Sequence, residues 1–271
     1  MTAVDDTPAP VPPPPAVAPL GHLGTVAVTQ LRGGPGGTTF ALGLAAVAAE
    51  QGMGWLIEAD PAGGVLIGRC EQLDGRRSLV DLAFPGAQAP VAPPELAASA
   101  AQTLGNTAVI VGPEQPTRAY ECVARPKHRW PGNLRHLPGW VVVDCGRLFP
   151  GSPALDVLRY ADAVVVVTPP EGGDVYRFTQ WATEGQRVVE SPVLVTSGPG
   201  RFSPRQLARE VGDAYLGPLP YAPKEVDLLE RGASTSHRAL YRSELVRSLL
   251  GRLQSIDAVV GANARSTRGA R

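Results

Sequence analysis

The residues with the clearest chemical potential form one glycine-rich run, Arg32-Gly33-Gly34-Pro35-Gly36-Gly37-Thr38-Thr39. The run follows a short apolar segment, residues 25–29, and precedes an amphipathic helical pattern over residues 40–51. Glycines allow backbone N–H groups to turn inward around an anion, and a helix N-terminus adds the positive end of its dipole. This context predicts a phosphate-binding loop. The alternative is that Gly33 to Gly37 form only a tight turn between strand and helix.

Other kinds of chemistry find less support. Ser197-Gly198 and Cys145-Gly146 lie near the ends of apolar segments, but neither has the sequence of a nucleophile elbow. The three cysteines are far apart and are expected to be reduced thiols. His128 and His136 have no nearby cysteine or acidic residue, so the sequence predicts no metal site of the zinc type.

The elements that must position the loop alternate along the chain. Several apolar runs lack polar alternation, as in strands covered on both faces, and this favours a parallel sheet. The expected strands are residues 25–29, 55–59, 108–111, 140–144, 163–168, 193–196 and 215–219. The expected helices are residues 40–51, 94–103, 175–184, 204–211 and 240–260. Such alternation predicts an α/β fold, a single three-layer doubly wound domain with a mainly parallel sheet of about seven strands.

Composition sets the boundaries of this domain. The Pro-rich residues 1–21 and the small, basic residues 261–271 are expected to be disordered, which leaves residues 22–260 as the folded domain. The 271 residues include 25 basic and 25 acidic ones, so no global field attracts nucleic acid or a membrane. The N-terminus lacks the features of a secretory signal, and no apolar run could span a bilayer, so we expect a cytoplasmic protein.

Over about residues 24–255 these motifs resemble the ParA/MinD branch of the SIMIBI class of P-loop ATPases, whose deviant loop reads Lys-Gly-Gly-Val-Gly-Lys-Thr-Thr. WLIEADPAGG resembles the family's second strand and acidic switch, VVVDCG its Walker B strand, and VVVVTPPEGGDV the next strand and its loop. VLVTSGPG and YLGPLPYAPKEV resemble the late strands that frame the adenine. The resemblance implies a P-loop NTPase-like fold and a site for ATP with Mg²⁺.

The resemblance also implies roles for individual residues. Asp60 takes the position of the acid that orients the attacking water, and Arg32 that of the signature lysine that reaches across a dimer interface. Thr38 and Asp144 would serve Mg²⁺. The nucleotide-binding positions are Gly33, Gly34, Gly36, Gly37, Thr38, Thr39, Ser197 and Pro220.

The departures from the family pattern concern the cationic part of the loop. Gly37 stands where the family has the lysine that reaches the terminal phosphates, and Leu31 replaces the opening glycine. Pro35 supplies no N–H, and Ser197 stands where an asparagine would read the adenine. Loss of one transition-state donor costs roughly 3–4 kcal/mol. The sequence therefore predicts weakened nucleotide binding and no efficient turnover.

Three interpretations remain open: a pseudo-ATPase that binds no nucleotide, a protein that binds it weakly, and a slow Mg²⁺-dependent ATPase in which Arg32 replaces the lysine. We favour the first. Such a protein would be an adaptor or positioning scaffold for a partition, septum, pilus or secretion machine. It would work with a protein partner, such as an active paralogue, or as a homodimer, and a partner would recruit it to the membrane or pole.

A basic segment offers a second candidate surface. Arg125, Lys127, Arg129 and Trp130 lie in a proline-interrupted stretch, residues 124–139, without an acid, and are the predicted partner-binding residues. Contact with DNA through this segment would make the chain a nucleotide-independent binding module, although a solvated connection is the alternative. The final helix carries an apolar stripe that suits either packing on the sheet or, as in MinD-type proteins, membrane binding.

Overall fold

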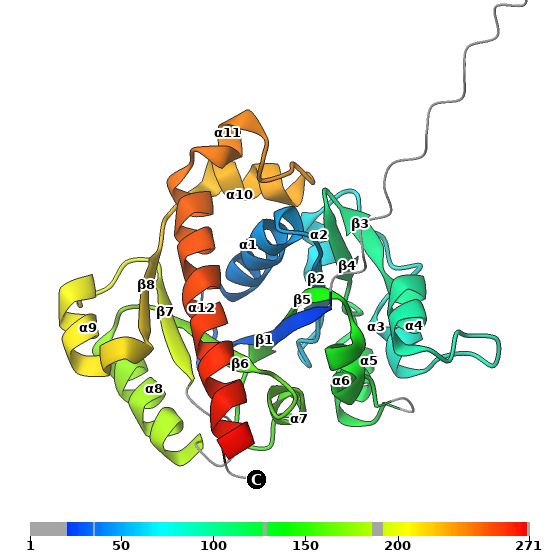
Figure 1. The fold of residues 1–271 in the computed structure, drawn as a ribbon, viewed down its shortest axis with the longest axis horizontal. Helices are drawn as coiled ribbons and strands as arrows, with labels where there is room; N and C mark the ends of the chain where they lie inside the picture. Colours follow the sequence, from blue (N-terminus) through cyan, green and yellow to red (C-terminus); the bar gives the residue numbers. More distant parts are fainter. Residues whose placement is uncertain (1–20, 35, 127–128, 186–191, 270–271) are drawn as a thin grey trace, which may run out of the picture.

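The computed structural model describes residues 21–34, 36–126, 129–185 and 192–269. Their centre is an eight-stranded sheet in the order β3-β4-β2-β5-β1-β6-β7-β8 (Figure 1). The strands are β1 (His22–Gln30), β2 (Gly54–Glu58), β3 (Gln102–Leu104), β4 (Thr107–Ile110), β5 (Gly139–Arg147), β6 (Ala163–Thr168), β7 (Val193–Ser197) and β8 (Tyr215–Leu219).

The sheet is parallel except at one edge. β1 lies between β5 and β6, with Val26 opposite Val142 and Ala163, and only β3 runs antiparallel to its neighbour β4. Alternate residues of β1 enter two different cores: Val26 and Val28 point to one face, and Ala27 points to the other. Because both faces are covered, the strands read as continuous apolar runs, and the predicted three-layer, mainly parallel architecture is confirmed.

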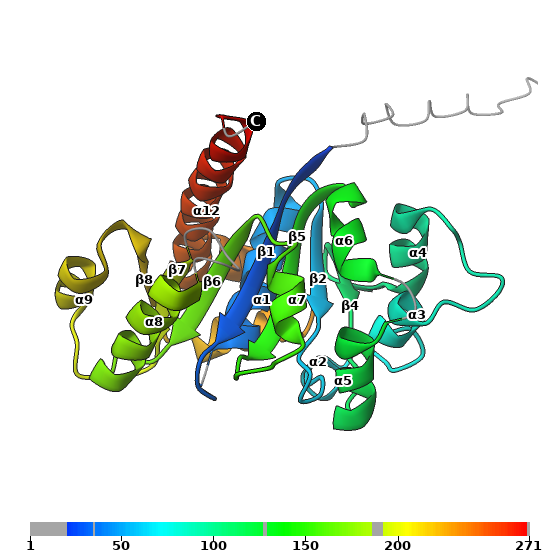
Figure 2. The same ribbon diagram turned by 90° about the horizontal axis from the view of Figure 1, so that it is seen from below.

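Helices form the two outer layers (Figures 1 and 2). One face carries α1 (Gly37–Glu50), α2 (Leu66–Arg69), α10 (Pro223–Glu230), α11 (Arg238–Tyr241) and α12 (Glu244–Gly269). The other carries α3 (Leu79–Ala83), α4 (Pro93–Ala100), α5 (Pro116–Ala124), α6 (Trp130–Asn133), α7 (Ala154–Leu158) and α8 (Gly172–Gly185). α9 (Pro204–Val211) packs beside β8, and the short 3₁₀ turns are η1 (Leu134–His136) and η2 (Gly212–Ala214).

One edge of the sheet differs from the sequence prediction. The helix expected over residues 94–103 ends at Ala100, and β3 begins two residues later. β3 and β4 form a hairpin through Gly105, whose φ of 58° suits glycine. A three-residue strand is too short to show an alternating pattern, so propensity extended the helix into it.

The C-terminal helix differs too. The helix expected over residues 240–260 is divided at Ser243, whose hydroxyl accepts the N–H of Val246 (3.1 Å) at the start of α12. The apolar stripe packs on α1: a side chain at Gly43 would begin 2.6 Å from a methyl of Leu249. α12 continues to Gly269, so the prediction of a disordered tail from residue 261 is wrong for residues 261–269. The Pro-rich residues 1–20 lie outside the described part of the chain.

This topology places several loops at one edge of the sheet. The turn from β1 to α1 and the segments after β2, β5, β6, β7 and β8 all follow the carboxyl ends of parallel strands, where α/β proteins hold their ligands. Within the described residues, no helix is long and apolar enough to cross a bilayer.

Candidate functional site

The glycine-rich loop connects β1 to α1 as the sequence predicts. Gly36 has the left-handed φ of 108° and directly precedes the helix. The first helical hydrogen bond runs from the N–H of Phe40 to the carbonyl of Gly36 (2.7 Å). The N–H groups of Gly37, Thr38 and Thr39 therefore belong to the unpaired first turn, where a helix attracts anions. Pro35 lies outside the described residues.

The loop is closely packed at Gly36. A Cβ atom there would lie 2.4 Å from the hydroxyl oxygen of Ser197, at the end of β7, and 2.9 Å from its Cβ. Only glycine fits this position, both for its φ and for its neighbour. Ser197 thus lies beside the loop itself. Pro220 follows β8 at the same edge and precedes Tyr221, whose side chain is 92% exposed.

Gln30 occupies the space beside Gly37. A Cβ atom built on Gly37 would lie 2.1 Å from the side-chain nitrogen of Gln30. The carboxamide oxygen of Gln30 also accepts the N–H of Gly34 (3.4 Å). A neutral amide therefore stands where a side chain at residue 37 would begin. Gln30 was not identified from the sequence. Its position, as a polar residue at the end of a buried strand directly before the loop, could have indicated a role in the site.

Asp144 lies opposite this loop on β5 and is almost completely buried. One carboxylate oxygen accepts the N–H of Gly146 (3.1 Å), while the other is buried and has no hydrogen-bond partner among the described residues. Burial raises the pKa of Asp144, and the Thr38 side chain and the Gly146 N–H act in the opposite direction. An unpartnered carboxylate oxygen near a threonine hydroxyl suits Mg²⁺, so Asp144 and Thr38 fit the predicted ion.

Asp60 lies next to Asp144. Its carboxylate accepts the N–H of Ala62 (2.8 Å) and packs so closely on Gly146 that a Cβ atom there would lie 2.0 Å from the carboxyl carbon. Burial raises the pKa of Asp60 to about 6, and the nearby charge of Asp144 contributes in the same direction. Two neighbouring acids with raised pKa values form an acidic cluster that a divalent cation would stabilise.

Glu58 is a third buried acid, which the sequence analysis missed. Its two oxygens accept the N–H groups of Val65 (2.6 Å), Leu66 (3.0 Å) and Gly112 (2.9 Å). Burial raises its pKa to about 7 despite these hydrogen bonds. Glu58 fastens the segment that carries Asp60 to the end of β4, so its role is to hold this loop in place.

The cations near the site are held by other acids. Arg32 lies 3.5 Å from Asp174, a buried residue in the first turn of α8, while its own side chain is 59% exposed. Arg69 on α2 donates to the hydroxyl of Thr39 (3.0 Å) and pairs with Glu230 on α10. Neither Arg69 nor Asp174 was identified from the sequence, because their partners are distant along the chain.

The basic segment does not form one exposed surface. Trp130 is fully buried in α6, and its indole N–H donates to the carbonyl of Cys122 (3.0 Å). The prediction that Trp130 contacts a partner is therefore wrong: a short helix turns the ring into the core beneath α5. Arg125 and Arg129 are exposed, as expected, and Lys127 lies outside the described residues.

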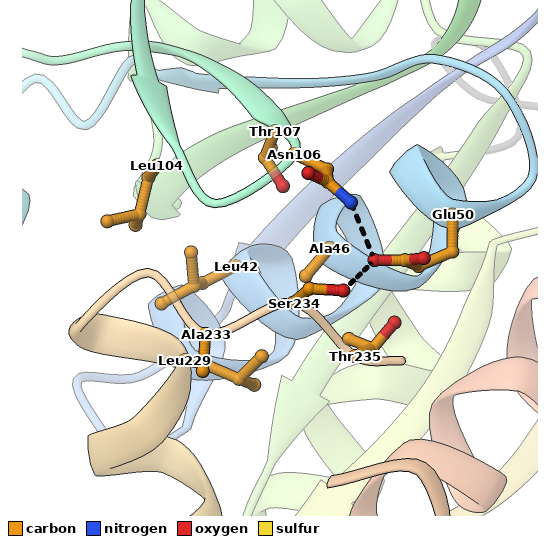
Figure 3. A pocket seen from close by; sticks show the side chains of 10 residues that line it. All are labelled: Leu42, Ala46, Glu50, Leu104, Asn106, Thr107, Leu229, Ala233, Ser234 and Thr235. Atoms are coloured by element: carbon orange, nitrogen blue, oxygen red, sulfur yellow. Dashed lines mark hydrogen bonds between the residues drawn. The ribbon is translucent and has the colours of Figure 1, made fainter. Parts of the chain in front are cut away.

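A small cavity elsewhere has a structural explanation (Figure 3). It lies between α1, the turn from β3 to β4, and the segment after α10, and its volume is about 10 Å³. Glu50 accepts hydrogen bonds there from Asn106 (3.0 Å) and Ser234 (2.5 Å). A space of this size holds no more than a water molecule, so it is not a ligand site.

Known proteins resemble this chain in structure but not in sequence. No protein-family model and no curated protein matches the sequence. The septum site-determining protein MinD of Pyrococcus horikoshii OT3, complexed with Mg-ADP, is 16% identical, with 88% of this chain and 98% of that chain covered and a TM-score of 0.68. A ParA family ATPase of Chlorobium tepidum TLS is 15% identical, with coverage of 85% and 97% and a TM-score of 0.64.

The structure of the MinC:MinD cell division protein complex of Aquifex aeolicus also matches, at 14% identity, with coverage of 85% and 94% and a TM-score of 0.61. Each of these likenesses spans nearly the full length of the solved chain. At sequence identities this low, the structural similarity shows a shared architecture but does not assign roles to individual residues. The chain therefore has the fold of the MinD and ParA ATPases.

Proposed function

We propose that this chain is a degenerate MinD/ParA-like protein, a pseudo-ATPase that acts by binding and positioning other proteins. The observation that carries the proposal is the neutral carboxamide of Gln30 that lies beside Gly37. The family's lysine is absent, and the carboxamide of Gln30 fills the space where a side chain would begin. Phosphoryl transfer depends on cations that neutralise the transferred phosphoryl group, so this loop lacks its main catalytic group.

Arg32 is a poor substitute within the single chain. It lies in the loop before the phosphate turn, and the buried carboxylate of Asp174 holds its guanidinium group. Arg177 shares the same carboxylate at 3.4 Å. Among the described residues, no hydrogen bond or ion pair brings the Arg32 guanidinium group to Gly37, Thr38 or Asp144, and this position gives the slow-ATPase alternative no support within one chain.

The acidic side of the site supports weak binding of a nucleotide with Mg²⁺. The free oxygen of Asp144, with Thr38 and Asp60 nearby, forms a pocket that a cation would satisfy. The first turn of α1 offers N–H groups to phosphate. We infer that ATP or ADP binds with reduced affinity and serves as a ligand, not as a substrate.

Exposed aromatic residues at the same edge support a protein partner. Phe149, Phe202 and Tyr221 follow β5, β7 and β8 and are 46%, 37% and 92% exposed. Large apolar side chains gathered around a ligand edge are typical of interaction surfaces. A second copy of this chain, an active paralogue, or a component of a partition, septum, pilus or secretion machine would bind there and recruit the protein to the membrane or pole.

The test is steady-state phosphate release from Mg-ATP by the purified protein. We expect a rate equal to the background, with no further decrease in Asp60→Ala or Arg32→Ala, because neither residue supports turnover. A control on the exposed surface, Arg205→Ala on α9, should behave in the same way. Efficient release that disappears in Asp60→Ala but persists in the control would overturn the proposal and establish the ATPase alternative.

A further inference from the structure

A groove lies at the opposite edge of the molecule from the phosphate loop. It has a volume of about 410 Å³ and lies between the end of α5, the start of α6 and the end of α7. These helix ends lead to the amino ends of β5 and β6, whereas the glycine-rich loop follows the carboxyl end of β1. The residues that line it include Arg125, Pro126, Arg129, Pro131, Arg159 and Tyr160.

The groove carries an excess of positive charge. Three arginines line it together with one acid, Asp156, which is paired with Arg159 (2.6 Å). Arg125 and Arg129 enter no ion pair with any residue that the structure describes. Two guanidinium groups are therefore available for an acidic ligand, and each can grip a carboxylate with two parallel hydrogen bonds.

The remaining walls are apolar and flat. Tyr160 is half exposed, and a Cβ atom on Gly132 of α6 would lie 3.3 Å from its ring, so the ring lies against this helix. Pro126 adds a partly exposed rigid surface, and Pro131, which is buried in α6, lies at the base of the groove. Aromatic and proline surfaces of this kind suit a polyproline segment, which is already extended before it binds and loses little entropy.

The chain's own N-terminal segment has the complementary composition. Residues 1–20 contain seven prolines, four of them consecutive at residues 12–15, and two acids, Asp5 and Asp6, with no lysine, arginine or histidine. A Pro-rich run with an acidic end therefore matches a groove that has an aromatic wall and an arginine pair.

The position at which this segment joins the domain brings it to the groove. The carbonyl of Gly21 accepts the N–H of Gly139 (3.0 Å), and His22 contacts the carbonyl of Leu137 (2.9 Å), six residues after the groove residue Pro131. Thr25 donates to Asp162 (2.7 Å), two residues after Tyr160. Figure 2 shows the start of β1 beside α6. Twenty residues at about 3.1 Å each span up to about 60 Å when fully extended, so the segment is long enough to fold back along this end of the domain.

From charge, surface and chain length together, we propose that residues 1–20 bind in this groove of their own chain. The prolines of residues 12–15 pack on Tyr160 and Pro126, and Asp5 and Asp6 pair with Arg125 and Arg129. The segment would then occupy the surface that an acidic partner would use. A partner that binds the groove must displace it, which makes the segment an internal competitor.

The test is paramagnetic relaxation enhancement on the full chain. The three native cysteines are buried, so Ala3→Cys provides one accessible site for a nitroxide label. We expect the amide signals of Arg125, Arg159 and Tyr160 to lose at least half of their intensity relative to the reduced label. The loss should disappear in Arg125→Glu/Arg129→Glu and in Asp5→Asn/Asp6→Asn. The matched control is Arg205→Glu/Arg209→Glu on the exposed face of α9, which should keep the full effect.

Three outcomes would overturn the proposal. The first is an absence of attenuation at the groove in the labelled wild-type sequence. The second is equal attenuation after charge reversal of Arg125 and Arg129. The third is attenuation that appears only between molecules, when a labelled chain is mixed with an isotope-enriched, unlabelled chain, because it would show that the segment binds a second copy.

Discussion

The two sides of the phosphate site differ in what they have kept. On the acidic side, Asp60 and Asp144 lie together around Gly146, and one oxygen of Asp144 remains available. On the loop side, residue 37 is a glycine, and the neutral amide of Gln30 fills the space beside it. Asp144 belongs to β5 and Asp60 follows the end of β2, so the sheet positions both carboxylates.

The proposed function requires a nucleotide fold without efficient catalysis, and this difference is compatible with it. The backbone of the loop must remain glycine-rich, because Gly36 is confined by its own φ and by Ser197. The contact between Gly36 and Ser197 does not involve the side chain at residue 37. Binding geometry and turnover are thus separable within one site.

The largest expected effect tests whether the loop is held rigidly. Gly36→Ala should lower the free energy of unfolding by about 2–3 kcal/mol, because it combines a strained φ with overlap on Ser197. Urea denaturation measures this change. Gly33→Ala is the matched control, since no atom lies within 4 Å of its added Cβ, and it should change stability by less than about 0.5 kcal/mol. Equal effects would mean that the loop is not packed as described.

The next prediction sharpens the role of Gln30. Gly37→Lys alone should give little gain in affinity for Mg-ADP, because the new side chain meets the Gln30 carboxamide at its first carbon. Gly37→Lys/Gln30→Ala should bind about tenfold more tightly than Gly37→Lys, which corresponds to about 1.4 kcal/mol. Calorimetric titration of the two variants measures the ratio. The Gln30→Ala single variant is the control, and a ratio of one would remove Gln30 from the account.

A smaller effect concerns pH and the acidic side. Asp60 titrates near 3.8 when unfolded and at about 6 when folded, so between these values the folded chain retains a proton that the unfolded chain has lost. This contribution is therefore favourable below about pH 4 and is lost as the pH rises to about 6. Because Asp60 is partly exposed and solvent screens its charge, we expect this change in the free energy of unfolding to be limited to about 1 kcal/mol.

Asp60→Asn should flatten this part of the stability curve between pH 4 and 6, as measured by urea denaturation at several pH values. Asp213→Asn, an exposed position in η2, should leave the slope unchanged. A slope that is identical in the wild type and in Asp60→Asn would show that Asp60 is not crowded by burial and Asp144.

The smallest expected effect belongs to Arg32. Its contact with Asp174 is long and largely exposed on the arginine side, so Arg32→Ala should change the free energy of unfolding by less than about 0.5 kcal/mol. Affinity for Mg-ADP should also stay within about twofold, which is about 0.4 kcal/mol. Calorimetry checks both statements. A tenfold loss of affinity would place Arg32 in the nucleotide site and weaken the contrast between the two sides.

The sequence predicted most of the sheet for a physical reason. β1, β5 and β6 are covered on both faces, so their apolar runs are continuous and easily read, whereas the three residues of β3 at the edge leave no pattern. The glycine-rich turn between β1 and α1 was predictable because glycines before a helix are a local signal.

The remaining features depend on tertiary contacts. Trp130 stands among arginines in the sequence and was expected at the surface, yet α6 turns it into the core. Gln30 and Glu58 gain their importance only from neighbours that are brought close by folding, such as Gly37 beside Gln30 and Gly112 beside Glu58. Local patterns cannot report such contacts.

The contrast between the two sides is tested most directly by calorimetric titration of the wild type and Asp144→Asn with ADP, with and without Mg²⁺. We expect weak binding of ADP by the wild type that requires Mg²⁺. In Asp144→Asn the affinity for Mg-ADP should fall at least tenfold, which corresponds to about 1.4 kcal/mol or more. Binding that is equally strong without Mg²⁺ or in Asp144→Asn, or no binding at all by the wild type, would contradict the claim that the acidic side still works.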